Sequence, residues 1–176
     1  MTGLSLLMAC VLAADAPQFA KPIRIVASGD AVFVANAKNG AVHTLDPTTL
    51  ELRATRSIGT QLTDFASHPD GGFVAIDPVA ETVVRLQASI GPPTTTLKVS
   101  RPERIAITDD GATAFVSSRW GKRVDVVSLN QDGLTFVRST FLSFQPLLMA
   151  ELPDKQIIVA DAFGGQLAVL SSTGEL

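Results

Sequence analysis

The stretch RPERIAITDDGATAFVSS, residues 101–118, decides the fold. It is one of four similar segments, each of which contains two short apolar runs separated by a turn. The other three are KPIRIVASGDAVFVAN (21–36), QLTDFASHPDGGFVAID (61–77) and QPLLMAELPDKQIIVAD (145–161). Their first residues are 40, 40 and 44 positions apart, so the chain repeats with a nearly constant period.

Each repeat is predicted to form a meander of short β-strands, because apolar runs alternate with polar turns. Gly in the first turn supplies the positive φ that tight hairpins require. The four turn pairs are Gly29-Asp30, Asp70-Gly71, Asp110-Gly111 and Asp154-Lys155. Third strands are expected at 42–45, 83–86, 124–127 and 167–170. Fourth strands are expected at 50–58, 94–99 and 134–141, and the last repeat reaches residue 176 without one.

Four strands in a period of about 40–45 residues are typical of a β-propeller blade. The sequence therefore predicts an all-β fold: a β-propeller arc of about four four-stranded antiparallel blades, which is a fragment of a larger ring. The expected blades are 21–60, 61–100, 101–144 and an incomplete 145–176. A single sandwich of short strands is the competing interpretation, but it does not require the same loop lengths four times. Because an arc exposes apolar faces at its ends, the isolated chain is expected to associate.

The repeats resemble those of the YVTN-type β-propeller family. Phe33-Val34-Ala35-Asn36 and Thr44-Leu45-Asp46 are similar to the strand patterns of that family, and His68-Pro69-Asp70-Gly71 is similar to its turn. The chain contains no Tyr. Phe33, Val74, Phe115 and Ile158 stand where the family often has one. The resemblance implies that these four side chains are buried in the propeller core.

The N-terminus carries the longest apolar run, Leu4–Ala14. Eleven residues are too few to cross a bilayer as a helix, but they match the core of a secretory signal. Residues 1–14 are therefore predicted to be a signal peptide and 15–20 a linker, with a buried first strand or helix as the alternative. Cys10 lies in a loose lipobox, although membership of the signal core is the favoured interpretation. The mature chain is expected to be exported to the periplasm or the extracellular space and to span no membrane.

The composition excludes several classes of function. The 176 residues contain 14 Lys and Arg against 17 Asp and Glu, which is not the basic balance of a nucleic-acid binder. A single Cys excludes an internal disulfide framework and a Cys-rich zinc site. Two His residues, with no triad, nucleotide-binding or C-x-x-C-H haem motif, provide no catalytic constellation. The chain is expected to hold no metal or cofactor of its own.

Polar residues at repeated positions of the first strands are candidates for a ligand site. A long polar residue precedes each first strand, and it is expected to face a ligand or, alternatively, to be solvated. These residues are Lys21, Gln61, Arg101 and Gln145. Three positions later stand Arg24, Asp64, Arg104 and finally Leu148. The alternating charges of the first three predict ion pairs between neighbouring blades.

Short polar residues close the second strands. They are Asn36, Asp77, Ser118 and Asp161. Calcium needs six or more oxygens around one point, whereas equivalent positions on successive blades are spread around a circle. We therefore expect turn caps rather than a metal site. His43 is expected to face solvent, and His68 to hydrogen-bond the backbone of its Pro-Asp-Gly turn.

A candidate partner surface lies in the loop that follows the second strand of the third repeat. This loop carries Arg119, Trp120 (the only Trp), Lys122 and Arg123, and Phe163 takes the position of Trp120 in the fourth repeat. Trp and Arg are the residues most enriched in interface hot spots. The partner is expected to be an acidic protein or a small anionic ligand. Alternatively, Trp120 folds back over the blade edge.

The preferred function is an exported propeller scaffold that binds a protein or small ligand through loops on one face. The alternative is the N-terminal half of a periplasmic enzyme or electron-transfer protein. The resemblance implies this alternative, since YVTN-type propellers are similar to those of lactonases, quinoprotein dehydrogenases and haem d1 proteins, and some are joined to c-type cytochrome domains. Its active residues would then lie beyond Leu176.

Overall fold

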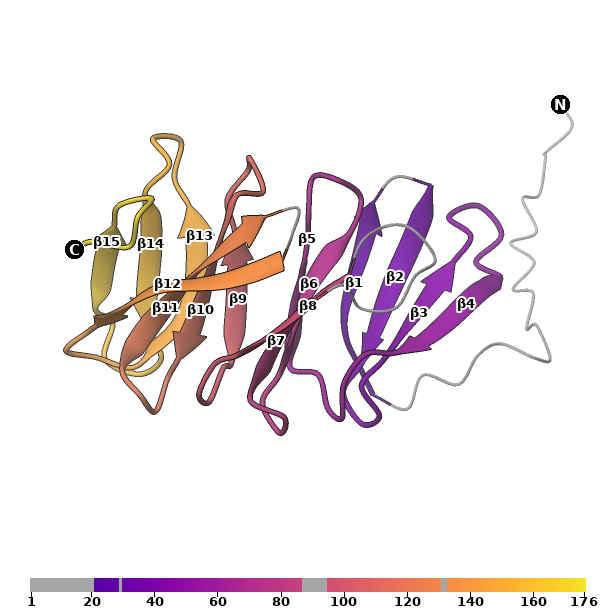
Figure 1. The fold of residues 1–176 in the computed structure, drawn as a ribbon, viewed down its shortest axis with the longest axis horizontal. Helices are drawn as coiled ribbons and strands as arrows, with labels where there is room; N and C mark the ends of the chain where they lie inside the picture. Colours follow the sequence, from indigo (N-terminus) through magenta and orange to yellow (C-terminus); the bar gives the residue numbers. More distant parts are fainter. Residues whose placement is uncertain (1–20, 29, 87–94, 131–132) are drawn as a thin grey trace, which may run out of the picture.

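The computed structural model describes residues 21–176 except 29, 87–94 and 131–132, and these ranges form four antiparallel sheets in a row (Figure 1). Each sheet is called a blade. Blade 1 contains β1 (Pro22–Ser28), β2 (Ala31–Asn36), β3 (Ala41–Leu45) and β4 (Leu52–Ser57). Blade 2 contains β5 (Asp64–Ser67), β6 (Phe73–Asp77), β7 (Thr82–Leu86) and β8 (Thr95–Lys98). Blade 3 contains β9 (Arg104–Ile107), β10 (Thr113–Ser118), β11 (Arg123–Asn130) and β12 (Gly133–Phe141), and blade 4 contains β13 (Pro146–Glu151), β14 (Ile157–Asp161) and β15 (Leu167–Leu170).

The strands of every blade pair in sequence order, so each blade is an up-and-down meander. The all-β propeller arc that the repeat predicts is therefore confirmed, with three strands in its last blade. The first strands of successive blades, β1, β5, β9 and β13, contact one another in turn and form the inner side of the arc. The predicted signal peptide, Cys10 and the linker lie outside the described residues.

The first turns of blades 2 and 3 have the geometry that the Asp-Gly pairs predict, whereas Gly29 in the predicted turn of blade 1 lies outside the described residues. The N–H of Gly71 donates to the carbonyl of His68, and the N–H of Gly111 donates to that of Thr108. Both glycines have positive φ, 86° and 72°. Blade 4 makes the same turn with Lys155 at a φ of 64°, a conformation that costs a side-chain-bearing residue about 1 kcal/mol or more.

Three apolar seams hold the blades together, and each seam is the packed layer between two successive blades. The seam between blades 1 and 2 contains Phe65, Phe73 and Ala35, with Phe33 packed against it. The next seam contains Val74, Val83 and Val116, and the third contains Phe115, Val124, Val126, Ile157 and Val159. Successive residues of a strand point to opposite faces, so β6 and β10 contribute to the seams on both sides of their blades.

The predicted burial of the four core residues is only partly correct. Val74 and Phe115 are fully buried, and Phe33 is half-buried at the edge of its seam. Ile158 is also only half-buried, and no blade among the described residues covers it, so here the prediction was wrong. The reason is strand alternation: Ile157 and Val159 of β14 face blade 3, so Ile158 between them points to the other face of blade 4.

The face of blade 4 that points away from blade 3 is apolar and open. We call it the free face, and define it by Leu148, Ile158, Ala160, Leu167 and Val169, which are joined across β13, β14 and β15 by strand pairing. Leu148 and Leu167 retain 61% and 64% of their accessible surface. The expected exposure of apolar surface at an end of the arc is therefore observed at this end.

Candidate functional site

One edge of the arc collects the loops that the sequence singles out. The N–H of Ala37, just after β2, donates to the carbonyl of Lys21, just before β1, at 2.9 Å. The N–H of Ala162 donates in the same way to the carbonyl of Gln145 at 2.8 Å. The start of each first strand therefore lies beside the loop between the second and third strands. We call this side of the molecule the loop edge.

The four residues that precede the first strands stand along the loop edge but make no contact with one another in the described part of the chain. Lys21, Gln61 and Arg101 are exposed, and Gln145 is half-buried. The backbone N–H of Arg101 donates to Glu81 Oε1 at 3.3 Å, which fixes the backbone rather than the guanidinium. These side chains remain candidates for contact with a ligand, without a built site among them.

The polar residues that close the second strands cap turns. Asp77 Oδ1 accepts the N–H groups of Val79 and Ala80, both at 2.9 Å. Asn36 Oδ1 accepts from the N–H of Lys38 at 3.0 Å, and Asp161 Oδ2 accepts from that of Gly164 at 2.7 Å. Ser118 is the exception, because its buried hydroxyl has no hydrogen-bond partner among the described residues. No group of three His, Cys, Asp or Glu side chains in the same ranges is arranged to hold a metal ion.

The Arg119 guanidinium lies near the rings of both Trp120 and Phe163 at the loop edge. The Arg119 Cζ atom is 5.1 Å from the centroid of the Trp120 ring and 5.9 Å from that of Phe163. Both rings are exposed, at 64% and 76%, so Trp120 does not fold back over its blade. The structure thus joins loops of blades 3 and 4 into one aromatic–guanidinium cluster through cation–π contacts.

The cations around this cluster are mostly neutralised, which differs from the expected positive patch. Arg119 Nε lies 3.1 Å from Glu103 Oε2, and Arg123 Nε lies 2.9 Å from Asp125 Oδ1. Lys122 Nζ donates to the Ser143 carbonyl at 3.4 Å and has no carboxylate partner among the described residues. Glu103 and Asp125 offset the charges of the half-buried Arg119 and Arg123 guanidinium groups. Among the described residues of this loop, the charge without a carboxylate partner is therefore that of Lys122.

A hollow of about 280 Å³ adjoins Phe163 at the loop edge. Its lining includes Lys122, Gln145, Asp161, Phe163 and Gln166. Gln145 Oε1 is buried and has no hydrogen-bond partner among the described residues. The hollow therefore places one cation, Lys122, and one carboxylate, Asp161, next to an exposed aromatic ring, which is a surface suited to a polar side chain of a partner.

The inner strands bring two of the three predicted ion-pair residues together. Arg24 Nη1 lies 2.7 Å from Asp64 Oδ1, across the seam between blades 1 and 2. Arg104 does not complete the predicted run, because its Nη1 donates to the Thr63 carbonyl at 3.1 Å. The second oxygen of Asp64 accepts instead from the backbone N–H of Ile105 at 3.1 Å. A backbone donor on β9 thus takes the position that the sequence suggests for a guanidinium.

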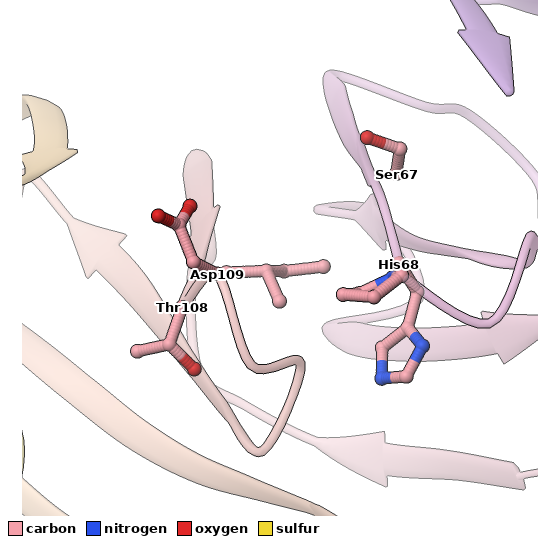
Figure 2. A pocket seen from close by; sticks show the side chains of 6 residues that line it. Ser67, His68, Thr108 and Asp109 are labelled. Carbon is pink, nitrogen blue, oxygen red and sulfur yellow. The ribbon is translucent and has the colours of Figure 1, made fainter.

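A second hollow, of about 310 Å³, lies between the first turns of blades 2 and 3 and is lined in part by Ser67, His68, Thr108 and Asp109 (Figure 2). These residue types occur in nucleophilic sites, but both ring nitrogens of His68 are engaged. Nδ1 lies 2.8 Å from Asp70 Oδ1, and Nε2 lies 2.8 Å from the Gly111 carbonyl. The Ser67 side chain points away from the imidazole (Figure 2). His68 therefore links two blades and does not activate a serine.

Asp70 anchors this link. Burial raises the pKa of Asp70, but hydrogen bonds from the Gly72 N–H and from His68, together with the Arg85 guanidinium, outweigh it and hold the pKa below the ordinary value. The N–H of Asp70 also lies 3.3 Å from His68 Nδ1, so His68 contacts the backbone of its turn as predicted. The prediction that His43 faces solvent was wrong: its side chain is buried, and its Nδ1 lies 2.9 Å from Thr55 Oγ1 on the neighbouring strand.

The four blades are similar to parts of solved structures. For Kuenenia stuttgartiensis hydrazine synthase the TM-score is 0.77 at 20% identity, over 90% of this chain and 48% of that chain. For virginiamycin B lyase from Staphylococcus aureus the TM-score is 0.75 at 15% identity, over 90% of this chain and 55% of that chain. For the β-propeller domain of Myceliophteria thermophila Cps50 (Swd1) the TM-score is 0.72 at 13% identity, over 84% of this chain and 52% of that chain. No family model and no curated protein matches the sequence.

These similarities establish the propeller fold, and the chain spans about half the length of the propeller chains it matches. At identities of 20% or less they carry no activity over to this chain. Within the described ranges, no helix has the length and apolar character needed to cross a membrane.

Glu103 is the site residue that sequence analysis missed. Its Oε2 atom forms an ion pair with Arg119 Nε of the aromatic cluster, at 3.1 Å. The signal was present in the repeat, because the equivalent positions hold Ile23, Thr63 and Leu147. A carboxylate at a position that is otherwise apolar or neutral indicates a contact specific to blade 3.

Proposed function

We propose that this chain is an exported YVTN-type propeller scaffold that binds an acidic protein partner at the loop edge. The observation that carries the proposal is the Arg119 guanidinium within cation–π distance of two exposed rings, those of Trp120 and Phe163. Exposed aromatic side chains beside an ordered Arg are the composition of interface hot spots. The arrangement is built by two blades, so the rigid propeller keeps it ready for binding.

The geometry favours a partner that presents a carboxylate. Guanidinium groups stacked on aromatic faces keep their N–H edges available for an acceptor. Glu103 Oε2 lies 3.1 Å from the buried Nε of Arg119 without hydrogen-bonding it, and the terminal Nη groups and the nearby Lys122 are available to the partner. The attraction involves solvent-accessible charges, so the affinity is expected to fall as the salt concentration rises.

Trp120 provides the test, because it is the only Trp in a chain without Tyr. A displayed peptide library would be selected on the purified chain at low salt, and the selected peptides titrated against Trp fluorescence. We expect enrichment of Asp and Glu, a change in Trp120 emission on binding, and a loss of more than about 1 kcal/mol on Trp120→Ala.

The matched control is Phe136→Ala, which removes another exposed aromatic side chain, on β12. This control is expected to leave the peptide affinity unchanged. Selected peptides without acidic residues, or equal affinities for the wild type and Trp120→Ala, would contradict the proposal.

The second candidate is the N-terminal half of a periplasmic propeller enzyme or electron-transfer protein. It is supported by a hollow of about 400 Å³ on the inner side of the arc and by the likeness to structures named as a synthase and a lyase. The reading frame downstream of residue 176 tests it. A C-x-x-C-H motif there would indicate attached haem and favour this candidate over the scaffold.

Export is proposed from the apolar run Leu4–Ala14. The mass of the product after expression in a bacterium with its native N-terminus tests it. A mature mass that begins after Ala13 or Ala14 would support a cleaved signal, and lipid on Cys10 would support the lipobox. An intact chain in the cytoplasm would exclude export.

A further inference from the structure

The first strands of all four blades line one hollow of about 400 Å³ on the inner side of the arc. Its walls differ in character. The polar wall contains Arg24, Thr63, Asp64 and Arg104. The apolar wall contains Leu147, Leu148 and Met149 of β13, and the hollow lies apart from the aromatic cluster of the loop edge.

The charges in this hollow do not cancel. Asp64 is fully engaged, since it accepts from Arg24 Nη1 at 2.7 Å and from the N–H groups of Phe65 and Ile105 at 3.0 and 3.1 Å. Arg104 donates only to the neutral carbonyl of Thr63, and no carboxylate within ion-pair distance of it belongs to the described ranges. One positive charge therefore remains, on a half-buried guanidinium with N–H groups to spare.

A second polar group in the same wall lacks a partner. Thr63 Oγ1 is buried and forms no hydrogen bond with the described residues. Buried hydroxyl groups are nearly always hydrogen-bonded, so the partner of this one is a water molecule or a bound ligand. Arg104 donates to the backbone carbonyl of Thr63. Within the part of the chain that the structure describes, the unpartnered Thr63 hydroxyl and the Arg104 guanidinium without a carboxylate therefore belong to two residues in contact.

The opposite wall selects for an apolar group. Leu148 takes the position that Arg24, Asp64 and Arg104 hold in the other blades, and it is 61% exposed. Covering such a side chain is favourable by about 25 cal/mol for each Å² of apolar surface removed from water. A hollow with one free cation, one free hydroxyl and an exposed Leu fits a molecule that is anionic at one end and apolar at the other.

We propose that this hollow binds a small organic carboxylate, with the carboxylate on Arg104 and Thr63 and the apolar part against Leu148. This site is distinct from the loop edge and does not depend on the function proposed for that surface. Arginine suits the task because its planar fork matches the geometry of a carboxylate.

Isothermal titration of the full chain with octanoate tests the proposal. We expect saturable binding of one octanoate per chain, and affinities at least about tenfold lower for octanol, which lacks the charge, and for inorganic phosphate, which lacks the apolar part. Arg104→Gln is expected to weaken octanoate binding by about tenfold or more, and Thr63→Val by a few-fold. Circular dichroism checks that each variant remains folded, and Thr63→Val keeps the test decisive if Arg104→Gln does not fold.

The matched control is Arg138→Gln. Arg138 is an exposed arginine of β12 that pairs with Glu175 and lies outside the hollow. Octanoate binding is expected to be unchanged in this variant and in Trp120→Ala, which separates this site from the loop edge. Equal binding of octanol and octanoate, an unchanged affinity in folded Arg104→Gln and Thr63→Val, or preference for phosphate would overturn the proposal.

Discussion

Blades 3 and 4 present the same repeat positions in opposite environments. Val124 and Val126 of β11 are 0% and 1% exposed, because blade 4 covers them. Their counterparts on β15, Leu167 and Val169, are 64% and 41% exposed on the free face. The difference shows that the burial of a blade residue depends on the presence of the next blade as well as on the residue itself.

The residues of the free face have the composition of a surface that packs against another blade. Leu167, Val169 and Ile158 are as apolar as the seam residues of blade 3, and exposed apolar patches of this kind mark interaction surfaces. Because the chain spans about half the length of the propellers it matches, we expect further blades of the same protein to cover the β14 and β15 part of this face, whereas Leu148 on β13 borders the inner hollow.

The largest expected contrast is between Phe115→Ala and Ile158→Ala. Phe115 is fully buried in the seam between blades 3 and 4, so its truncation is expected to lower the free energy of unfolding by about 3–5 kcal/mol. Ile158 occupies the equivalent position on the free face and is half-buried, so its truncation is expected to cost only about 1 kcal/mol. Urea unfolding of both variants provides the comparison, and equal losses would show that the free face is covered in solution.

The free face is also expected to control the association of the isolated chain. Leu167→Lys places a charge on this face, and it should shift the sedimenting species toward the monomer in analytical ultracentrifugation. The matched control is Val79→Lys, at an exposed position on the loop between β6 and β7, and it should leave association unchanged. A wild-type chain that is monomeric at all concentrations would contradict the expectation.

The repeat was sufficient to predict the fold, since it determines the strands, the turns and the polar caps at Asn36, Asp77 and Asp161. These features depend on local chemistry. The contact of Arg104 with the Thr63 carbonyl and the exposure of Ile158 depend on which blade faces which, and a single repeat does not contain that information. The alignment of Trp120 with Phe163 anticipated their proximity, but not that the Arg119 guanidinium contacts both rings.

Acid should act on two carboxylates that differ in what their partners hold. Asp70 contacts residues of its own blade, but two of them, His68 and Arg85, also contact the carbonyls of Gly111 and Asn130 in blade 3. Burial raises the pKa of Asp70, but hydrogen bonds from Gly72 and His68 outweigh burial, so the pKa is lowered. Asp46 lies within blade 1, where the N–H of Thr49 and the Arg53 guanidinium lower its pKa to about 2. A lowered carboxylate pKa adds stability that is complete above the unfolded value, near 4, and is lost as the pH falls through the folded value.

Denaturant midpoints measured between about pH 5 and pH 2 test both contacts. The wild type is expected to lose stability across this window, and both Asp46→Asn and Asp70→Asn should flatten that loss. Asp70→Asn should in addition weaken the seam at neutral pH, because it removes the partner of Arg85 Nη2 at 3.0 Å. A pH dependence that is unchanged in both variants would contradict the assignment of these pKa shifts.

The smallest expected effect concerns the first turn of blade 4, which lacks the glycine of its neighbours. Gly71 and Gly111 accept positive φ without a Cβ, whereas Lys155 adopts 64° with one. Lys155→Gly is therefore expected to raise the free energy of unfolding by about 0.5–1 kcal/mol. The exposed contact of Lys155 Nζ with Asp110 Oδ2, at 3.6 Å, adds little to the wild type, since such pairs contribute about 0–1 kcal/mol. Lys155→Ala is the control, because it removes the same contact and keeps the Cβ. If Lys155→Gly is no more stable than Lys155→Ala in urea, the turn of blade 4 is not strained, and its departure from the repeat has no cost.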